Sequence, residues 1–401
     1  MKILMINSYY APNFHGGADI CVQHLAKGLQ QAGHDVVILT LAKELYDSTH
    51  SVNGVTVHYL GVNNWMSHIR NKDQSAIHKA IWQLSSAANI AMSRRLREIY
   101  LREKPNLVHT HILAGFSTKP WSVASKLSLP VVHTLHDYFL ICPRGTMFRG
   151  NSMCCRQCSD CRLITQLRKR DAQDIAAVVG VSNYILQAHV AKGYFSGVPV
   201  CSVINNSIPD VVPTAAPKLP QGPLRLGFLG RLEPFKGLDL LLDAVSRIST
   251  EKVTLNIAGV GVDKYVQHLK TTWSLPNAEY FGLVDPESFL PEIDVLVVPS
   301  NYHDPAPRVV LEALAYGIPV LGNSYGGMSE LIEEGKSGWI WDLSQPDALF
   351  KSIEKLVDER ENYQGRHQQC LQRAATFTRE IMVNKHLDLY ENLLAKQGAT
   401  M

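Results

Sequence analysis

Residues 295–312, with the sequence VLVVPSNYHDPAPRVVLE, decide the class of fold. Four apolar residues predict a buried strand, Pro299-Ser300 ends it, and a helix is expected to follow. We expect Asp304 to cap that helix, with Pro305 at its first position. On that basis Asp304 and Glu312 lie about two helical turns apart and face one ligand. Carboxylates suit a diol such as a ribose, because they accept two hydrogen bonds.

The same strand–helix alternation extends outward through the whole chain. In the second half we expect further strands at residues 224–229, 253–258, 278–281 and 319–323. In the first half we expect strands at 1–7, 36–40, 107–112, 131–136 and 177–182, and a long helix at 76–103. Alternation of this kind predicts parallel sheets with helices on both faces, of the Rossmann-like α/β class.

A proline-rich stretch divides the chain. Five prolines fall within residues 208–223, which keeps that segment extended and predicts a linker. We therefore expect one domain at 1–207 and a second at 224–375. The remaining residues, 376–401, contain a helix with an apolar stripe, which we expect to pack back on the first domain.

The composition narrows the class of protein. The 401 residues are 46% hydrophobic and 19% charged, as in a soluble globular protein, and a net charge of +3 gives no argument for nucleic acid. No apolar run reaches the length of a membrane span, and the first residues read as a strand and not as a signal peptide. We expect a cytoplasmic protein, with peripheral contact at the inner membrane face left open.

A pair of cations follows the strand at 224–229. Arg231 lies directly after that strand, and Lys236-Gly237 precedes the next helix. A helix N-terminus offers free N–H groups and partial positive charge, so this segment suits a diphosphate. The alternative is two solvated charges on a surface loop.

Several short motifs, taken in order, carry a family resemblance. They are Gly16-Gly17, Val108-His109-Thr110-His111, His133-Thr134-Leu135-His136-Asp137, Val181-Ser182, Gly230-Arg231-Leu232, Lys236-Gly237, Gly259 and Gly261, Gly282, Pro299-Ser300, Leu311-Glu312-Ala313, Gly317-Ile318-Pro319-Val320, and Gly326-Gly327 with Glu330. The chain resembles the retaining glycosyltransferases of glycosyltransferase family 4. The resemblance implies the GT-B fold, in which two Rossmann-like parallel-sheet domains face each other across a cleft.

The resemblance also implies roles for single residues. Arg231 and Lys236 would hold the diphosphate of a UDP- or GDP-sugar, Glu312 the ribose, and the backbone near Val284 the base. Gly16 and Gly17 would let the first domain approach the donor closely, and His136 would lie against the reacting sugar. The plainer interpretation of His136 is a core histidine at the end of a strand. For His109 and His111 we favour packing over a metal pair.

The segment after residue 303 departs from the family pattern. Asp304 stands where the family has glutamate, so its contact with the sugar hydroxyls is altered. Pro307 has no N–H to donate to a phosphate, whereas Arg308 and Val309 still have theirs. We count Asp304 with His136 as candidate catalytic residues and Arg308 and Val309 as candidate donor ligands.

The expected chemistry is sugar transfer with retention of configuration, the leaving phosphate taking the acceptor proton. The sequence has no Asp-x-Asp motif, and cations with helix N–H groups can stabilise the leaving diphosphate, so we expect no catalytic metal. The expected acceptor is a glycan or a lipid-linked glycan, in polysaccharide or glycolipid biosynthesis.

Five of the eight cysteines lie within residues 142–161. They are Cys142, Cys154, Cys155, Cys158 and Cys161. Their spacing predicts a structural metal held by four of the five, with zinc favoured over an iron–sulfur cluster. The surrounding segment is basic, so we expect it to order an acceptor site and attract a phosphorylated or membrane-bound acceptor. The alternative is a solvated loop.

Two other functions stay open at this point. A GT-B nucleotide-sugar epimerase would share the nucleotide site and act without an acceptor. A metal or iron–sulfur protein centred on the cysteines would be coloured when it carries a cluster.

Overall fold

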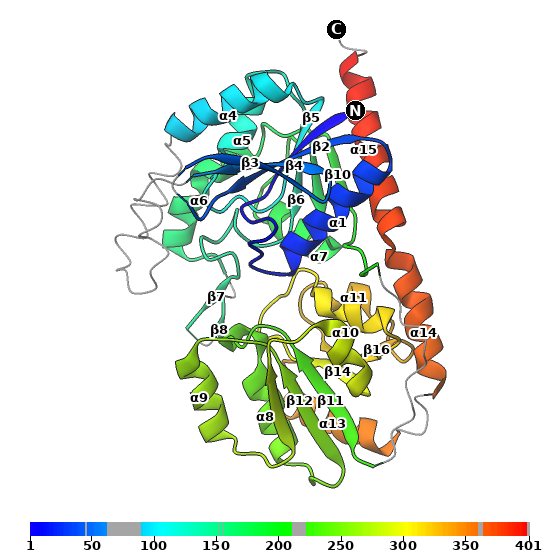
Figure 1. Ribbon diagram of the computed structural model, residues 1–401. Coiled ribbons are helices and arrows are strands. Elements are labelled where there is room, and N and C mark those ends of the chain that lie inside the picture. Colours follow the sequence, from blue (N-terminus) through cyan, green and yellow to red (C-terminus); the bar gives the residue numbers. More distant parts are fainter. Residues whose placement is uncertain are drawn as a thin grey trace. The chain divides into compact units, whose positions relative to one another are not determined.

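The structure is a computed structural model that describes residues 1–44, 46–61, 90–150, 152–154, 156–210, 222–359 and 364–398. The chain forms two compact units (Figure 1). The first comprises residues 1–147, 155–206 and 379–401, and the second comprises 148–154 and 207–378. Most of the proline-rich stretch, residues 211–221, lies outside the described residues.

The first unit is built on an eight-stranded sheet with the order β10-β9-β6-β5-β1-β2-β4-β3. These strands are β1 (Lys2–Ile6), β2 (Asp35–Leu41), β3 (Ser48–Val52), β4 (Val55–Leu60), β5 (Leu107–Thr110), β6 (Val131–Leu135), β9 (Ala177–Gly180) and β10 (Val200–Val203). All pairings are parallel except that of β3 with β4. The edge strands β3 and β10 and the neighbouring β4 are absent from the sequence prediction.

Six helices of the described residues belong to this unit. They are α1 (Gly17–Gln31), α4 (Ile90–Glu103), α5 (Lys119–Ser125), α6 (Ser159–Asp171), α7 (Asn183–Val190) and α15 (Arg379–Gly398). The predicted helix at 76–103 is confirmed from Ile90 onward, and its first part lies outside the described residues.

The C-terminal helix α15 packs on the first unit, as the sequence predicts. Its Met382, Val383 and Tyr390 join the apolar cluster that α1 and the sheet form. Gly28 of α1 makes this contact possible, because a Cβ at that position would lie 2.4 Å from Cγ2 of Val383. The Tyr390 hydroxyl is hydrogen-bonded to Nδ1 of buried His109 at 2.6 Å.

The second unit has a six-stranded parallel sheet with the order β13-β12-β11-β14-β15-β16. Its strands are β11 (Leu224–Leu229), β12 (Val253–Ala258), β13 (Ala278–Gly282), β14 (Val295–Val298), β15 (Val320–Asn323) and β16 (Gly338–Trp341). A small antiparallel hairpin, β7 (Phe148–Arg149) with β8 (Ser152–Met153), also belongs to this unit. The predicted strands agree with β11 to β15, whereas β16 and the hairpin are not predicted.

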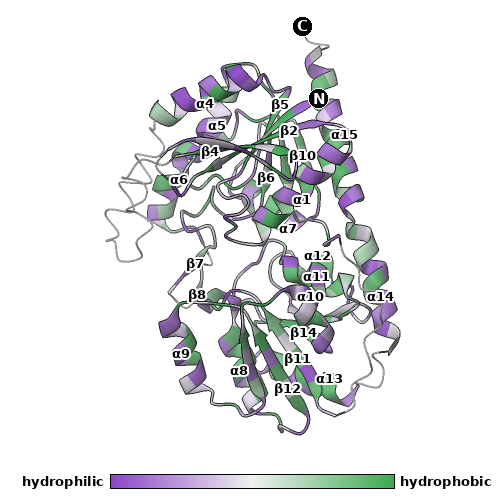
Figure 2. Cartoon of the chain, in the orientation of Figure 1, coloured by the Kyte–Doolittle hydropathy of each residue, from purple (hydrophilic) through white to green (hydrophobic). Residues whose placement is uncertain are grey.

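Seven helices of the described residues cover the second sheet. They are α8 (Leu238–Ser246), α9 (Asp263–Thr272), α10 (Pro286–Phe289), α11 (Arg308–Ala315), α12 (Met328–Leu331), α13 (Ala348–Asp358) and α14 (Gln364–Ala374). Helices α8 and α13 contribute to one apolar cluster on the strands, and α11 and α14 contribute to another. Figure 2 shows apolar residues gathered on the strands of both sheets, and hydrophilic residues along α4 and α9.

The two-domain α/β class predicted from the sequence is therefore confirmed. Within the described ranges, no helix is both long and apolar enough to cross a bilayer.

Several histidines are buried in the first unit. Burial lowers the pKa of His133 to about 3 and the pKa values of His189 and His386 to about 4. Among the described residues, Nε2 of His189 and Nε2 of His386 have no hydrogen-bond partner. These rings are therefore neutral in the folded protein at pH values where an unfolded histidine is charged.

The contact of α1 with α15 predicts the effect of enlarging Gly28. We expect Gly28→Leu to lower the free energy of unfolding by about 1–3 kcal/mol, because the side chain must displace Val383. The matched control is Gly365→Leu, at a helical position where a Cβ meets nothing within 4 Å. Urea unfolding measures both, and an equal effect of the two substitutions would contradict this packing.

The buried histidines predict acid sensitivity. As the pH falls below about 6.5, the histidines of the unfolded chain become protonated, whereas the buried rings of the folded protein stay neutral. The free energy of unfolding therefore falls by about 1.4 kcal/mol per pH unit for each such histidine. The loss continues down to the folded pKa values of about 3 to 4. We expect His189→Gln and His386→Gln each to reduce the slope of unfolding free energy between pH 6 and 5 by about one proton.

The double variant should reduce that slope by about two protons. Urea unfolding at several pH values measures the slopes. Variants whose slopes match that of the wild type would show that these rings are protonated in the folded state.

Candidate functional site

The strand order of the second unit reverses at β11. The chain places β12 on one side of β11 and β14 on the other, so the loops after β11 and β14 leave the same edge in opposite directions. Ligands of open α/β sheets bind at such a switch point, beyond the carboxyl ends of the strands. Arg231 and Lys236 follow β11, and Tyr302 and Asp304 follow β14.

Backbone contacts tie the two loops together. The N–H of Asn301 donates to the carbonyl of Phe235 at 2.8 Å. Gly237 has a φ of +70°, and a Cβ there would lie 2.1 Å from the Pro299 carbonyl oxygen. Only glycine therefore fits at this position, which is also the N-cap of α8.

Lys236 connects the loops through its charge. Its Nζ lies 2.7 Å from Oδ2 of Asp304 and 3.5 Å from the Tyr302 hydroxyl. Asp304 is buried, and the Lys236 side chain keeps 22% of its exposure. Arg231 is more exposed and pairs with Glu233 at 3.0 Å. The structure thus brings Lys236 and Asp304 into direct contact at the switch point.

The prediction that Asp304 caps a helix starting at Pro305 is wrong. Helix α11 begins at Arg308, and its N-cap is Pro307. Residues before a proline avoid helical backbone angles, so Pro307 delays the start of the helix. Asp304 lies in the loop and binds Lys236 instead, so the expected two-turn helical spacing to Glu312 does not exist.

Glu312 is buried on α11 and forms an ion pair with Arg308, one turn earlier. Burial raises the pKa of Glu312, and the Arg308 guanidinium opposes that rise. Val309 follows Arg308 in the first turn of α11, where backbone N–H groups have no partner within the helix. Val284 lies in the loop after β13 and packs against the apolar cluster that includes α11.

In the first unit, Gly16 and Gly17 stand at the start of α1. Gly16 is its extended N-cap, and a Cβ on Gly16 would meet nothing within 4 Å. The buried carboxylate of Asp19 accepts hydrogen bonds from the N–H groups of His15 and Gly16 and from the Asn7 side chain. The sequence analysis missed Asp19 and Asn7, although an acidic residue in the first turn of a helix is a recognisable signal.

His136 directly follows β6, beside a second histidine. Its Nε2 lies 3.1 Å from Nδ1 of His111, which follows β5. Burial lowers the pKa of His136 to about 3, so its imidazole is neutral at physiological pH. His109 is hydrogen-bonded to Thr134 and Tyr390, in agreement with the packing role expected for it.

The cysteines of the insert divide between the units. Cys142, Cys158 and Cys161 belong to the first unit, Cys154 belongs to the second, and Cys155 lies outside the described residues. Cys158, Asp160 and Cys161 offer ligand atoms that all lie within 4.8 Å of one another. Cys142, Cys158 and Cys161 form no disulfide with one another.

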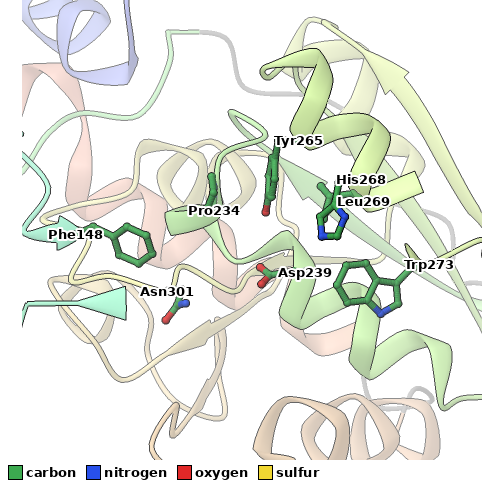
Figure 3. A pocket seen from close by; sticks show the side chains of 8 residues that line it. All are labelled: Phe148, Pro234, Asp239, Tyr265, His268, Leu269, Trp273 and Asn301. Atoms are coloured by element: carbon green, nitrogen blue, oxygen red, sulfur yellow. The ribbon is translucent and has the colours of Figure 1, made fainter. Parts of the chain in front are cut away.

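A pocket of about 170 Å³ lies in the second unit next to the β11 loop (Figure 3). Phe148 of the hairpin, Pro234, His268 of α9 and Trp273, which directly follows α9, are among the residues that line it. The Tyr265 hydroxyl points toward the carboxylate of Asp239. Apolar walls with a few polar groups of this kind are typical of small-ligand pockets.

Comparisons with known proteins agree with these features. Residues 16–205 match a family described as "Glycosyl transferase 4-like domain", and residues 223–359 match "Glycosyl transferases group 1". An uncharacterized 42.6 kDa protein in the cps region of Klebsiella pneumoniae is 31% identical over 82% of this chain and 87% of its own length.

Two solved structures show the same fold. A sucrose-phosphate synthase from Thermosynechococcus elongatus has a TM-score of 0.77 and 17% identity, covering 98% of this chain and 99% of that one. The Anabaena protein HepE in complex with UDP-glucose has a TM-score of 0.67 and 18% identity, with full coverage of both chains.

These matches extend over both units and over most of the chain's length. The chain therefore belongs to the glycosyltransferases that join a glycosyl transferase 4-like domain to a group 1 domain, and it is a hexosyltransferase-type enzyme of the GT-B fold.

Proposed function

We propose that this enzyme transfers a hexosyl group, with retention of configuration, from a UDP- or GDP-sugar to a glycan or lipid-linked acceptor in polysaccharide or glycolipid biosynthesis. The observation that carries the proposal is the Lys236–Asp304 pair at the switch point of the second sheet. The UDP-glucose complex of the Anabaena protein supports a UDP-sugar, and the cps-region relative supports a surface polysaccharide.

Lys236 and Arg231 are the proposed ligands of the diphosphate, together with the N–H groups of Arg308 and Val309. Breaking the sugar–phosphate bond places negative charge on the leaving diphosphate. Fixed cations and N–H groups stabilise that charge where it develops, and they do so without a catalytic metal. Asp304 keeps the Lys236 ammonium in place at 2.7 Å before the donor arrives.

Glu312 is the proposed ligand of the ribose hydroxyls, and backbone near Val284 meets the base. Glu312 pairs with Arg308 in the structure. A bound diphosphate would attract the Arg308 guanidinium, and the ribose hydroxyls would then donate to the Glu312 carboxylate. The exchange leaves the Arg308 cation paired with the diphosphate and the Glu312 carboxylate hydrogen-bonded by the ribose, so neither buried charge loses its partners.

His136 and Asp304 are the proposed groups at the transferred sugar. The sugar develops positive charge in the transition state. A neutral His136 can hydrogen-bond to a sugar hydroxyl without opposing that charge, and burial keeps it neutral. The open space beside Gly16, and the missing side chain of Gly17, would leave room for the donor. The leaving phosphate would accept the proton of the acceptor hydroxyl.

The exposed side chains of helix α6 support the proposal that the acceptor lies at a membrane surface. Leu163 is 74% exposed and Leu167 is 41% exposed, one turn apart. Arg162 and Arg170 are exposed on the same helix. Apolar side chains beside basic ones are the features of helices that bind anionic lipid surfaces, so we propose peripheral contact through α6.

A donor panel tests the proposed reaction. We expect UDP- or GDP-sugars to release nucleoside diphosphate in the presence of a membrane or glycan extract, and the product linkage to keep the donor's anomeric configuration by NMR. ADP- and TDP-sugars are the comparison. An inverted linkage would overturn retention, and epimerised sugar formed without acceptor would indicate an epimerase.

Substitutions at Lys236 and His136 should separate binding from chemistry. Lys236→Met removes a charge-assisted hydrogen bond worth about 1.5–3 kcal/mol, so UDP affinity by calorimetry should fall roughly ten- to hundredfold. His136→Ala should lower kcat by roughly tenfold or more while the Kd for UDP changes little, because it acts on the sugar during transfer.

Lys351→Met is the matched control, because Lys351 is exposed on α13, which follows the last strand of the second sheet. It should leave both quantities unchanged. If His136→Ala weakens UDP binding as much as Lys236→Met, the assignment of His136 to the sugar is wrong.

A further inference from the structure

We propose that Cys142, Cys158 and Cys161, with the carboxylate of Asp160, form a structural zinc site that holds together the two ends of the segment 143–157. The proposal does not depend on the identity of the donor or acceptor. It names a site in the first unit that sugar transfer itself does not require.

The start of α6 presents three of the four ligands. Cys158 is the N-cap of α6, with extended backbone at φ −63° and ψ 157°, and Cys161 lies buried in the first turn. The ligand atoms of Cys158, Asp160 and Cys161 lie within 4.8 Å of one another. Tetrahedral zinc with bonds of about 2.3 Å needs sulfur atoms about 3.8 Å apart, so these three ligand atoms lie near the spacing that zinc requires.

Hydrogen bonds hold the segment that contains Cys142 next to the start of α6. The Gln157 side chain donates to the Ile141 carbonyl at 2.8 Å and to the Thr165 hydroxyl at 2.9 Å. The Thr165 hydroxyl in turn donates to the Cys161 carbonyl. Cys142 is buried, and its thiol interacts electrostatically with that of Cys161. Residues separated in sequence by a whole hairpin are therefore adjacent.

The surroundings suit an anionic metal centre. Three thiolates and one carboxylate exceed the charge of Zn²⁺ by two. The guanidinium of Arg168 is buried nearby, donates to the Phe139 carbonyl, and lies 3.8 Å from the centroid of the Phe139 ring. It interacts electrostatically with Cys142 and Cys161, and also with Asp137. One buried cation thus offsets part of the excess charge.

The position of the site gives it a role. The hairpin β7–β8 lies between Cys142 and Cys158 in sequence and belongs to the second unit. Its Phe148 packs on Phe235, with ring centroids 6.1 Å apart, and Phe235 packs on Tyr302. Fixing both ends of this segment reduces the entropy lost when Phe148 docks beside the loop that carries Lys236.

Metal analysis of the full chain tests the site. Protein expressed with zinc and purified under reducing conditions without chelator should contain about one zinc per chain. Cys142→Ser, Cys158→Ser and Cys161→Ser should each lose most of that zinc, and Asp160→Asn should hold it more weakly against a chelator. Cys201→Ser is the control, because Cys201 is exposed on β10, and it should retain the metal.

Proteolysis gives a second measurement. Removing zinc from the wild type should increase cleavage within residues 143–157, and adding zinc back should reverse the increase. Wild-type protein with far less than one zinc per chain, a Cys158–Cys161 disulfide in reduced protein, or equal zinc in Cys161→Ser and Cys201→Ser would each overturn the proposal. Bound iron with visible absorbance would overturn the choice of zinc.

Discussion

The reversal of strand order at β11 is the constraint on which the donor side of this enzyme depends. Because β12 and β14 lie on opposite sides of β11, the loops after β11 and β14 start at the same edge of the sheet and lead to helices on different sides of β11. Glycine lets the neighbouring loops approach: a Cβ on Gly259 would lie 1.7 Å from the Gly230 carbonyl oxygen. Any larger residue there would push the loop after β12 away from the loop that carries Arg231.

The charges at this edge are paired without a ligand. Lys236 pairs with Asp304, and Arg308 pairs with Glu312, both acids being buried. A buried carboxylate without a partner is costly, so each acid needs its cation for the fold to be stable. The same cations are the groups that a diphosphate would attract. In the proposed function, stability of the fold and affinity for the donor therefore use the same side chains.

The sequence predicts β11 and β12 to the residue because buried apolar residues recur at alternate positions along both strands. Strand β3 (Ser48–Val52) is not predicted because it is a polar strand at the edge of the sheet, and its antiparallel pairing with β4 stabilises it. The predicted start of α11 is wrong for two reasons. Pro307 disfavours helical backbone at the residue before it, and Asp304 pairs with Lys236, a residue distant in sequence, so this ion pair could not be predicted. The His111–His136 contact joins residues that directly follow two different strands, so only the register of β5 with β6 brings them together.

Burial of the histidines connects the core of the first unit to the proposed chemistry. His136 has a pKa near 3, and buried His386, which lies on α15, helps to lower it. The packing of α15 that completes the apolar core thereby also withdraws water from the imidazoles. A solvated histidine would carry a charge for part of the time near neutral pH and would oppose a sugar that becomes cationic during transfer. Desolvation removes that opposition, so a half-buried residue that sequence analysis would first assign to the core is suited to the reacting sugar.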